Sequence, residues 1–451
     1  MKLDEYLETV SEQIRYTKIR QTVTDELKGH ILDQAEAYEA CGAFPEEALE
    51  RAVREMGDPV ETGVALDHIH RPQMNWGIVA LIGLVSVFSI GIFYVANLTG
   101  YDRYSWQHQA TFVLFGFLLM LLVYRLDYSI LGKSGWKSAV IFLVTLFALW
   151  LVFGREINGM RRWIHLGFVS FSVSETMLLY VPLFSAALYA FRGDGYGILW
   201  KAGLFMIIPV FFLFQIPDLS AALVLFTCLL CLFIFAVWKG WYQIAKKAVI
   251  GISSGIVLLT PAAFIGYFYF FGQVYQRDRI RAFFSTGESG HYIVGITRSM
   301  RESSALIGQS RQSVEYFLNG PTTDFLTDYI LVTMCGLYGI LLTVIIIAAL
   351  LLIIMKVFRI SVTQKNQLGM ITGVGCGLVF FVKTMVNILM NLQLLPYVSI
   401  SMPFLSYGGS SILVSYILLG LVLSIYRYKN ILPNRPENQK RRYLKITWET
   451  R

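Results

Sequence analysis

The stretch LTDYILVTMCGLYGILLTVIIIAALLLIIM, residues 326–355, decides the fold class of this chain. It contains a single charged residue, Asp328, and as a helix it is long enough to cross a hydrocarbon core of about 30 Å. The whole chain is 55% hydrophobic and only 15% charged, which is too apolar for a soluble protein of 451 residues. We therefore expect an all-α, polytopic membrane protein.

Nine other apolar segments have the length of membrane-crossing helices, so we expect about ten spans. The fifth and sixth spans are separated only by Pro217-Asp218, which makes their boundary the least sharp. The expected spans are 76–96, 108–124, 136–153, 175–191, 199–216, 219–237, 247–271, 326–355, 370–391 and 409–427.

The 72 residues before the first span have a different character. They hold 16 Asp and Glu against 8 Lys and Arg, whereas the rest of the chain holds 14 against 30. Apolar residues recur at helical spacing from Leu3 to Ile14 and from Val23 to Ala35. A third helix is expected over 46–56, and Gly57-Asp58-Pro59 is expected to end it. This prefix therefore predicts a small soluble helical domain.

The basic residues of the short loops predict the orientation in the membrane. Alternate loops and the tail after the last span are rich in Lys and Arg, whereas the opposite loops 97–107, 217–218 and 392–408 hold only Arg103. Because the number of spans is even, both termini are expected in the cytoplasm. The expected parts are a cytoplasmic prefix domain over 1–72, a membrane domain over 73–430 and a basic cytoplasmic tail over 431–451.

Two outer loops break this charge bias. Loop 154–174 carries three arginines, and loop 272–325 carries six. Basic groups on the disfavoured side of a membrane need a local reason, and binding an anion is the obvious one. The second loop is too long for a plain connector, and its partial helical periodicity predicts a folded element with amphipathic helices lying over the bundle.

Asp324, two residues before the apolar run 326–355, is the strongest candidate catalytic residue. A carboxylate at the rim of a membrane bundle is costly, so a functional role is the default expectation. An ionised carboxylate shielded from bulk water can act as a general base. Its other interpretation is a plain helix cap. Asp328, one turn later, is a second acid that fits a partner, a metal ligand or a helix-terminal carboxylate.

Further polar groups are expected at the same surface. Arg161 and Arg162 can bind phosphate oxygens bidentately, with lipid headgroups as the alternative target, and Trp163 suits a membrane interface. The stretch 406–411, Ser-Tyr-Gly-Gly-Ser-Ser, opens the tenth span. Its adjacent glycines permit a tight turn whose N–H groups hold an anion, or a plain turn between two spans.

Four polar residues lie within or at the mouths of apolar spans. Glu175 is expected to pair with one of the arginines or to act as a helix N-cap. Asp218 is expected to pair or hydrogen-bond inside the bundle. Lys383 and Asn387 lie one turn apart in the ninth span, where a lysine should face a cavity or a partner acid.

These motifs, in this order, resemble the SEDS family of shape, elongation, division and sporulation proteins typified by RodA and FtsW. The resemblance covers about residues 76–430, and its most specific part is the run 403–411, Pro-Phe-Leu-Ser-Tyr-Gly-Gly-Ser-Ser. The prefix more weakly resembles the helical prefix domains of some Gram-positive permeases. The other matching motifs are Asn158-Gly159, Arg162-Trp163-Ile164, Ser174-Glu175, Pro217-Asp218-Leu219, Arg279-Ile280, Thr323-Asp324-Phe325 and Asn387-Ile388.

The resemblance implies a ten-helix fold and a peptidoglycan glycosyltransferase of the bacterial cytoplasmic membrane, serving cell elongation, division or sporulation. Such enzymes polymerise lipid II, an undecaprenyl-pyrophosphate-linked disaccharide peptide, usually beside a class B penicillin-binding protein. Membrane lipids are the other expected partner, and nucleic acid is not one. Asp324 takes the general-base position. The expected substrate-binding residues are Arg161, Arg162, Trp163, Glu175, Asp218, Arg279, Lys383, Asn387, Ser406, Tyr407, Gly408, Gly409 and Ser410.

No cofactor is implied with certainty. A divalent cation, Mg²⁺ or Mn²⁺, could share the pyrophosphate charge, but the sequence shows no ligand cluster for one and we assign no metal ligand. The five cysteines predict neither a disulfide framework nor a zinc site.

The chain departs from the family pattern around the expected polar cavity. Ser172-Val173 replaces a Gln-Pro pair, Ile216 replaces a Gln before Pro-Asp, and Lys383 stands where a Gln is expected. A paired Glu after the Thr-Asp-Phe motif is missing. Two other functions therefore stay open: a flippase or transporter of lipid-linked cell-wall precursors, and an inactive scaffold that activates a partner synthase. Transporters often contain internal repeats, and none is visible here.

Overall fold

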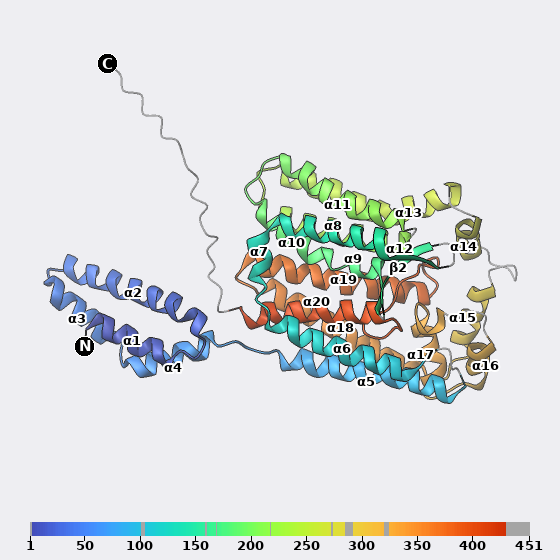
Figure 1. Cartoon of the computed structure of the whole chain (residues 1–451), viewed down its shortest axis with the longest axis horizontal. Helices are drawn as coiled ribbons and strands as arrows, with labels where there is room; N and C mark the ends of the chain where they lie inside the picture. The colour runs from blue at the N-terminus through green and yellow to red at the C-terminus, as the bar shows by residue number, and fades with distance from the viewer. Residues whose placement is uncertain are drawn as a thin grey trace, which may run out of the picture. The chain divides into compact units, whose positions relative to one another are not determined.

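The computed structural model describes residues 2–100, 104–157, 160–167, 169–216, 218–271, 274–284, 292–319 and 324–429 (Figure 1). The chain divides into two compact units, one built on the residues up to Met74 and one spanning Asn75–Ile425. The expected basic tail, 431–451, lies outside the described residues.

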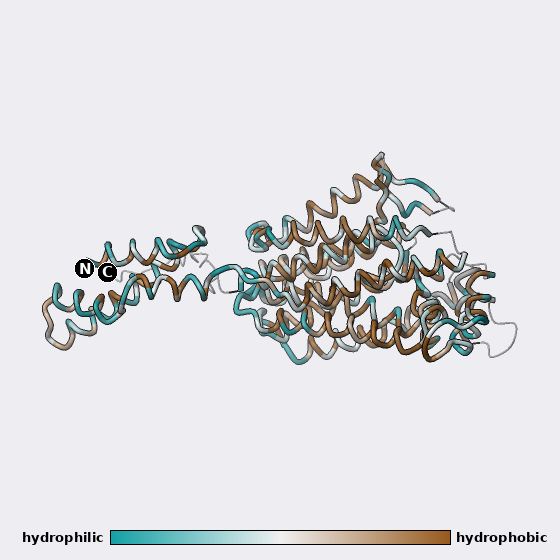
Figure 2. Tube along the Cα trace, turned by 90° about the horizontal axis from the view of Figure 1, so that it is seen from below, coloured by the Kyte–Doolittle hydropathy of each residue, from teal (hydrophilic) through white to brown (hydrophobic). Residues whose placement is uncertain are grey.

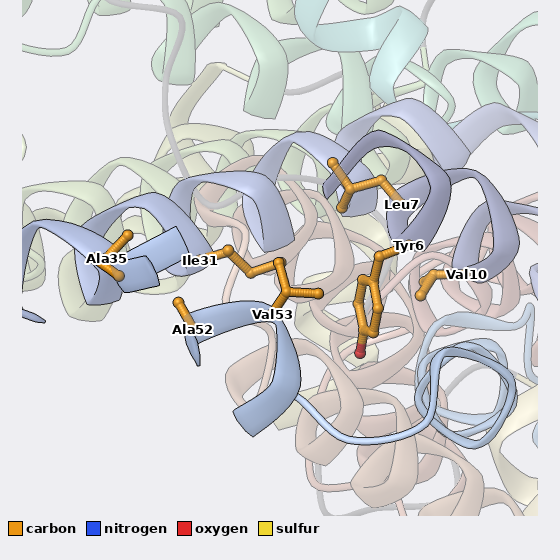
Figure 3. Close-up of a cluster of buried hydrophobic side chains, with 8 residues drawn as sticks. Tyr6, Leu7, Val10, Ile31, Ala35, Ala52 and Val53 are labelled. Carbon is orange, nitrogen blue, oxygen red and sulfur yellow. The ribbon is translucent and has the colours of Figure 1, made fainter. Parts of the chain in front are cut away.

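The first unit is helical, as the sequence predicted. Its buried core combines the apolar positions of three helices, and the Tyr6 hydroxyl donates to the Met56 carbonyl at 3.2 Å (Figure 3). The core residues are Tyr6, Leu7, Val10, Ile31, Ala35, Ala48, Ala52 and Val53. The four helices are α1 (Leu3–Gln13), α2 (Thr17–Ala40), α3 (Pro45–Glu55) and α4 (Pro59–His70).

Helix α4 was not expected, because Gly57-Asp58-Pro59 was interpreted only as a stop. Gly57, with a φ of +80°, does follow the end of α3. The next two residues then start a helix: the Asp58 carboxylate accepts from the Glu61 N–H at 3.0 Å, and Pro59 occupies the first turn. Asp67 fastens α4 to the end of α1 by accepting from the Arg15 N–H at 2.9 Å.

Within the described residues of the second unit, ten helices are long and apolar enough to cross a membrane, as predicted. Figure 2 shows apolar residues running along most of their length. The crossing helices are α5 (Trp76–Leu98), α6 (Trp106–Arg125), α8 (Trp136–Phe153), α9 (Val173–Met177) continued by α10 (Tyr180–Ala190), α11 (Gly197–Gln215), α12 (Leu219–Trp238), α13 (Lys246–Phe271), α18 (Ile340–Val362), α19 (Gln367–Asn391) and α20 (Gly409–Arg427). A short helix, α7 (Ser129–Ser134), precedes α8.

The eighth expected span, 326–355, is divided by a glycine. Gly339 has a φ of +94°, and a Cβ there would approach backbone atoms of Ile307 and Gly308 to 2.9 Å. The Gly308 N–H donates to the Tyr338 carbonyl at 3.1 Å. The crossing helix therefore begins at Ile340, and the preceding residues belong to the end of the bundle. They form a 3₁₀ turn, η1 (Asp324–Leu326), and α17 (Ile330–Tyr338).

Two connecting segments fold over the same end of the bundle as α17 (Figure 1). The long loop contains three helices, which confirms the expected folded element. The described residues between 154 and 172 instead form an antiparallel sheet of order β1-β2-β3 that was not expected, in which Trp163 pairs with both Arg155 and Ser172. These elements are α14 (Val274–Phe284), α15 (Tyr292–Glu302), α16 (Arg311–Asn319), β1 (Gly154–Ile157), β2 (Met160–Leu166) and β3 (Val169–Ser172).

Candidate active site

A cavity of about 710 Å³ opens at this end of the bundle. Its size is within the range of small-molecule sites, and its wall combines charged, hydroxyl and aromatic side chains. Segments far apart in the sequence contribute to it, because the sheet, η1 and the loop before α20 meet there. The polar lining includes Arg162, Trp163, Glu175, Asp218, Asp324, Asp328, Lys383, Ser399, Ser401, Tyr407, Ser410 and Ser411.

Asp324 lies on the wall of the cavity as the first residue of η1. Its backbone carbonyl accepts from the Tyr329 N–H at 2.9 Å, which closes the turn. The next residue, Phe325, is fully buried and packs against Phe317 with ring centroids 5.8 Å apart. The carboxylate oxygen Oδ2 accepts from the Tyr397 hydroxyl at 3.1 Å. The turn is therefore anchored while the half-buried side chain of Asp324 faces the cavity.

The same tyrosine joins Asp324 to Asp328, which precedes α17 outside the ten candidate spans. Asp328 Oδ2 accepts from Tyr397 and from Ser399, each at 2.8 Å. Burial is the largest influence on Asp328 and raises its pKa to about 7; the charges of Asp324 and Asp218 also raise it. The hydrogen bonds from Tyr397 and Ser399 lower it. Asp328 is thus a second acid of the site that exchanges its proton near neutral pH.

Tyr397 and Ser399 were missed by the sequence analysis. Both lie in the loop 392–408, which carried no charge to single it out. Burial, followed by the charges of Asp328 and Asp324, raises the pKa of Tyr397 well above its usual value, so the phenol stays neutral. Its ring stacks on Tyr329 at 5.4 Å, which fixes the hydroxyl between the two acids.

Lys383 faces a partner acid, as expected, and that acid is Glu175. The ammonium lies 2.9 Å from Glu175 Oε1 and 2.7 Å from Oε2, and only 4% of the lysine side chain is exposed. Ser401 donates to Glu175 Oε1 at 2.8 Å, and Lys383 also contacts Ser401 and Ser411. Glu175 is therefore paired with a lysine and not with an arginine, and the N-cap of α9 is Ser172.

The loop before α20 is hydrogen-bonded to the turn that carries Asp324. Ser406 Oγ donates to the Thr327 carbonyl at 2.5 Å and accepts from the Met402 N–H at 2.7 Å. The Tyr407 N–H donates to the Leu326 carbonyl at 2.9 Å. The hydroxyl of Ser406 is thus occupied by backbone groups, whereas the ring of Tyr407 lines the cavity.

The two glycines of this loop lie on the cavity wall. Gly408 has a φ of +145°, and a Cβ on Gly409 would meet the Phe112 ring at 2.9 Å, so both positions need glycine. The next residue, Ser410, accepts from the Ser172 N–H at 2.8 Å, which fastens the start of α20 to the end of β3. The sheet and the loop therefore share one wall of the cavity.

The two arginines of β2 that were expected to bind substrate have different surroundings. Arg162 and Trp163 line the cavity, and 36% of Trp163 is exposed. Arg161 is not among the lining residues: its guanidinium donates to the carbonyls of Leu151 and Gly154 at 2.8 Å each. These carbonyls end α8, where a cation stabilises the negative end of the helix dipole. Arg161 therefore has a structural role at the end of α8.

The remaining expected residues have different positions. Asp218 lines the cavity and caps α12 by accepting from the Ala221 N–H at 3.1 Å. Asn387 is buried and donates to the carbonyls of Asp328 and Ile400 at 2.9 and 2.7 Å, so it positions backbone behind the cavity. Arg279 lies in α14, and its side chain is outside the described part of the structure. Asn158, Gly159 and Pro217 also lie outside the described residues.

A ready-made cation site is absent from the described residues, which contain no group of three or more His, Cys, Asp or Glu side chains able to hold a metal ion. The divalent cation stays a prediction, and the side chains of this chain carry the proposed reaction.

The chain matches the family model of the FtsW, RodA and SpoVE cell cycle proteins over residues 71–431. A probable peptidoglycan glycosyltransferase FtsW from Haemophilus influenzae is 29% identical over 356 residues, covering 77% of this chain and 87% of that protein. The peptidoglycan glycosyltransferase MrdB from Escherichia coli K12 is 25% identical over 369 residues, covering 78% of this chain and 94% of its own.

Solved structures share the fold. A peptidoglycan synthase complex, described as coordinating polymerization and crosslinking, contains a chain that superposes with a TM-score of 0.61 at 24% identity, covering 79% of this chain and 98% of that one. The rod-shape-determining protein RodA of Thermus thermophilus superposes with a TM-score of 0.54 at 20% identity, covering 79% and 97%.

Proposed function

This chain belongs to the FtsW, RodA and SpoVE family of cell cycle proteins, the SEDS family, and from that premise we propose that it is a peptidoglycan glycosyltransferase that polymerises lipid II. Relatives that align over most of their length are named as enzymes of this activity. One observation carries the proposal to this chain: Asp324, the acid of the family motif, lies on the wall of a cavity that also holds Arg162 and a glycine loop.

The reaction is a single displacement. Asp324 removes the proton from the 4-hydroxyl of the acceptor sugar, and the resulting oxygen attacks the anomeric carbon of the donor. The bond to undecaprenyl pyrophosphate breaks, and the leaving group departs with the electron pair. Because no enzyme nucleophile takes part, the anomeric centre is inverted, as in inverting glycoside chemistry.

Arg162 is the arginine that serves the leaving group in this proposal. It lines the cavity, whereas Arg161 is bound to the end of α8. A guanidinium offsets the negative charge that grows on pyrophosphate oxygens as the glycosidic bond breaks. The N–H groups around Gly408 and Gly409, at the start of α20, are suited to the same anion.

We place the protein in the bacterial cytoplasmic membrane with the cavity facing outward and both termini in the cytoplasm. The ten apolar helices and the positive charge of the alternate loops support this orientation. The partner proposed is a class B penicillin-binding protein, because a structural neighbour is part of a synthase complex that couples polymerization to crosslinking.

The test is polymerisation of labelled lipid II by purified full-length protein, alone and with a candidate penicillin-binding partner. Asp324→Asn should lower glycan-strand synthesis by roughly 10²–10⁴-fold, because the base that activates the acceptor is removed. Asp194→Asn is the matched control, since Asp194 forms an ion pair with Lys201 at 2.7 Å and does not line the cavity.

Two results would contradict the proposed activity, and a third would contradict the role of Asp324. Translocation of lipid II across vesicles without glycan synthesis by the wild-type protein indicates a flippase. Wild-type protein that makes no strands but stimulates its partner indicates a scaffold. Normal turnover by a folded Asp324→Asn variant removes Asp324 from the general-base role.

A further inference from the structure

Two carboxylates and one phenol form a continuous hydrogen-bonded chain at the cavity. The Tyr397 hydroxyl lies 3.1 Å from Asp324 Oδ2 and 2.8 Å from Asp328 Oδ2. A phenol carries one proton, so it donates to one carboxylate at a time. Its oxygen can meanwhile accept from the other acid when that acid is protonated. The geometry is therefore suited to moving a proton between Asp324 and Asp328.

The Asp328 end of this chain is held in place by three further side chains. Ser399 donates to Asp328 Oδ2 at 2.8 Å, and the Asn387 and Asn391 amides donate to the Asp328 carbonyl at 2.9 and 3.0 Å. Only 6% of Asp328 is exposed, yet the residue lines the same cavity as Asp324. This support keeps the second acid within reach of the tyrosine without exposing it to bulk water.

Among the described residues, the charges that shift the pKa of Asp328 come from two other acids, Asp324 and Asp218, and the phenol between the carboxylates stays neutral. The Lys383 ammonium, which lines the same cavity, is paired with Glu175 at 2.7 Å. The charged or titratable residues that line the cavity are Arg162, Glu175, Asp218, Asp324, Asp328, Lys383 and the tyrosines 104 and 407.

We propose that Tyr397 relays the proton taken up by Asp324 to Asp328, which stores it during each addition. This inference rests on the proposed function and assigns two positioning residues to it. Protonated Asp324 donates to the Tyr397 oxygen while the phenolic proton passes to Asp328 Oδ2. Two O–H bonds form as two break, leaving Asp324 ionised, Tyr397 neutral and Asp328 protonated. Asp328 then releases its proton to water that enters the cavity as the product advances.

The relay answers a requirement of repeated synthesis. A general base is protonated after each addition and cannot accept the next sugar proton until it is reset. The substrate would cover Asp324 at that moment, whereas Asp328 lies behind it and can receive the proton through Tyr397. A storage acid functions best when its pKa is close to the working pH, because it must both accept and release the proton.

The relay predicts a specific pH dependence of polymerisation. Asp328 must be ionised to accept the proton, and burial raises its pKa to about 7, so kcat should rise with pH through neutrality. Tyr397→Phe and Asp328→Asn should each lower kcat by about 10-fold, leave KM little changed and abolish this rise, since proton transfer by positioned groups contributes at least this much.

A third variant moves the pH dependence without removing either acid. Ser399→Ala deletes a hydrogen bond that favours the ionised form of Asp328. The pKa of Asp328 should therefore increase, and the rise in kcat should shift to higher pH. A residue that only holds the structure together would lower activity at every pH without such a shift. This variant also tests the relay if Asp328→Asn does not fold.

Tyr338→Phe is the matched control. Tyr338 is a tyrosine of α17 whose hydroxyl donates to the Gly91 carbonyl at 2.7 Å, and it does not line the cavity. Its loss removes a hydroxyl from a partly buried tyrosine, as Tyr397→Phe does, but this hydroxyl contacts a backbone carbonyl and no acid. Tyr338→Phe should therefore leave the pH profile of kcat as in the wild type.

The relay is overturned if Tyr397→Phe and Asp328→Asn keep the wild-type pH profile, or if Ser399→Ala leaves the rise in kcat at its wild-type pH. That outcome leaves the proposed function intact, since Asp324→Asn still abolishes synthesis. Failure of the proposed function is a different result, in which the wild-type protein makes no glycan strands at any pH. The two ideas therefore fail separately.

Discussion

The cavity has two acidic regions that handle buried charge in different ways. On one side Glu175 is neutralised by Lys383, and Ser401 and Ser411 complete the pair. In the second region Asp324 and Asp328 share the hydroxyl of one neutral tyrosine. An ion pair with no net charge fixes the geometry, because a change of charge on either member has a high energetic cost. Two neighbouring acids can instead share a proton that moves between them.

The largest effect on stability is expected when the cation of the neutral pair is removed. Lys383→Met leaves the half-buried Glu175 carboxylate beside hydroxyl groups without its counter-charge, the ammonium that lies 2.7 Å away. Loss of one partner of a fully buried pair costs about 3–5 kcal/mol, which is the upper limit for this pair. We expect a large fall in the thermal unfolding temperature in detergent.

The double variant Lys383→Met, Glu175→Leu is the control for that experiment. It removes both charges and should recover most of the lost stability, since an apolar pair of similar volume is often as stable as the ion pair. A single variant as stable as the wild type would show that the pair is not structural.

A second prediction concerns the stability of the acid pair and its sign with pH. Asp328 has a pKa raised by burial from 3.8 to about 7, so the folded state binds more protons than the unfolded state in between. Stability therefore falls as pH rises through this window. Asp328→Asn should be more stable than the wild type above pH 7, by on the order of 4 kcal/mol, because the pKa differs by about 3 units and each unit corresponds to about 1.4 kcal/mol.

The free energy of unfolding of the wild type and of Asp328→Asn should be compared at several pH values, from 3.8 to about 7 and above. The stability gap between the proteins should grow toward neutral pH. A gap that stays constant with pH would mean that Asp328 does not change its protonation on folding.

The smallest effect on stability is expected for a serine beside the Lys383–Glu175 pair. Ser401→Ala removes a hydroxyl that donates to Glu175 at 2.8 Å and also contacts Lys383 and Ser411, but it leaves the ion pair in place. We expect a loss of about 1–2 kcal/mol, since a single hydrogen bond contributes about 1 kcal/mol. Thermal unfolding at constant pH measures it, and a loss as large as that of Lys383→Met would show that the serine and not the lysine holds the glutamate.

Local sequence was sufficient to predict the features that depend on runs of residues. Apolar length predicted ten spans, and helical periodicity predicted helices in loop 272–325. The rarity of a lysine within a span predicted a cavity or a partner acid beside Lys383. The sequence motifs also led to Asp324 and Arg162, which the structure places on one cavity.

The missed features depend on contacts between distant segments. Tyr397 and Ser399 become part of the site only because their loop folds against Asp328, about seventy residues earlier in the chain, as the sequence separations of these bonds show. The break at Gly339 depends on backbone atoms of Ile307 and Gly308. Helix α4 was missed for a local reason, since Asp58 and Pro59 can both end one helix and start the next.

The break at Gly339 joins the start of α18 to the long loop 272–325. The Ile340 and Leu341 N–H groups donate to the Ala305 and Leu306 carbonyls at 3.0 Å each, and the Gly308 N–H donates to the Tyr338 carbonyl at 3.1 Å. One short run of backbone therefore holds the end of α17 and the start of α18 together. A change of bilayer thickness that tilts α18 is thus transmitted through this run toward the segment that carries Asp324.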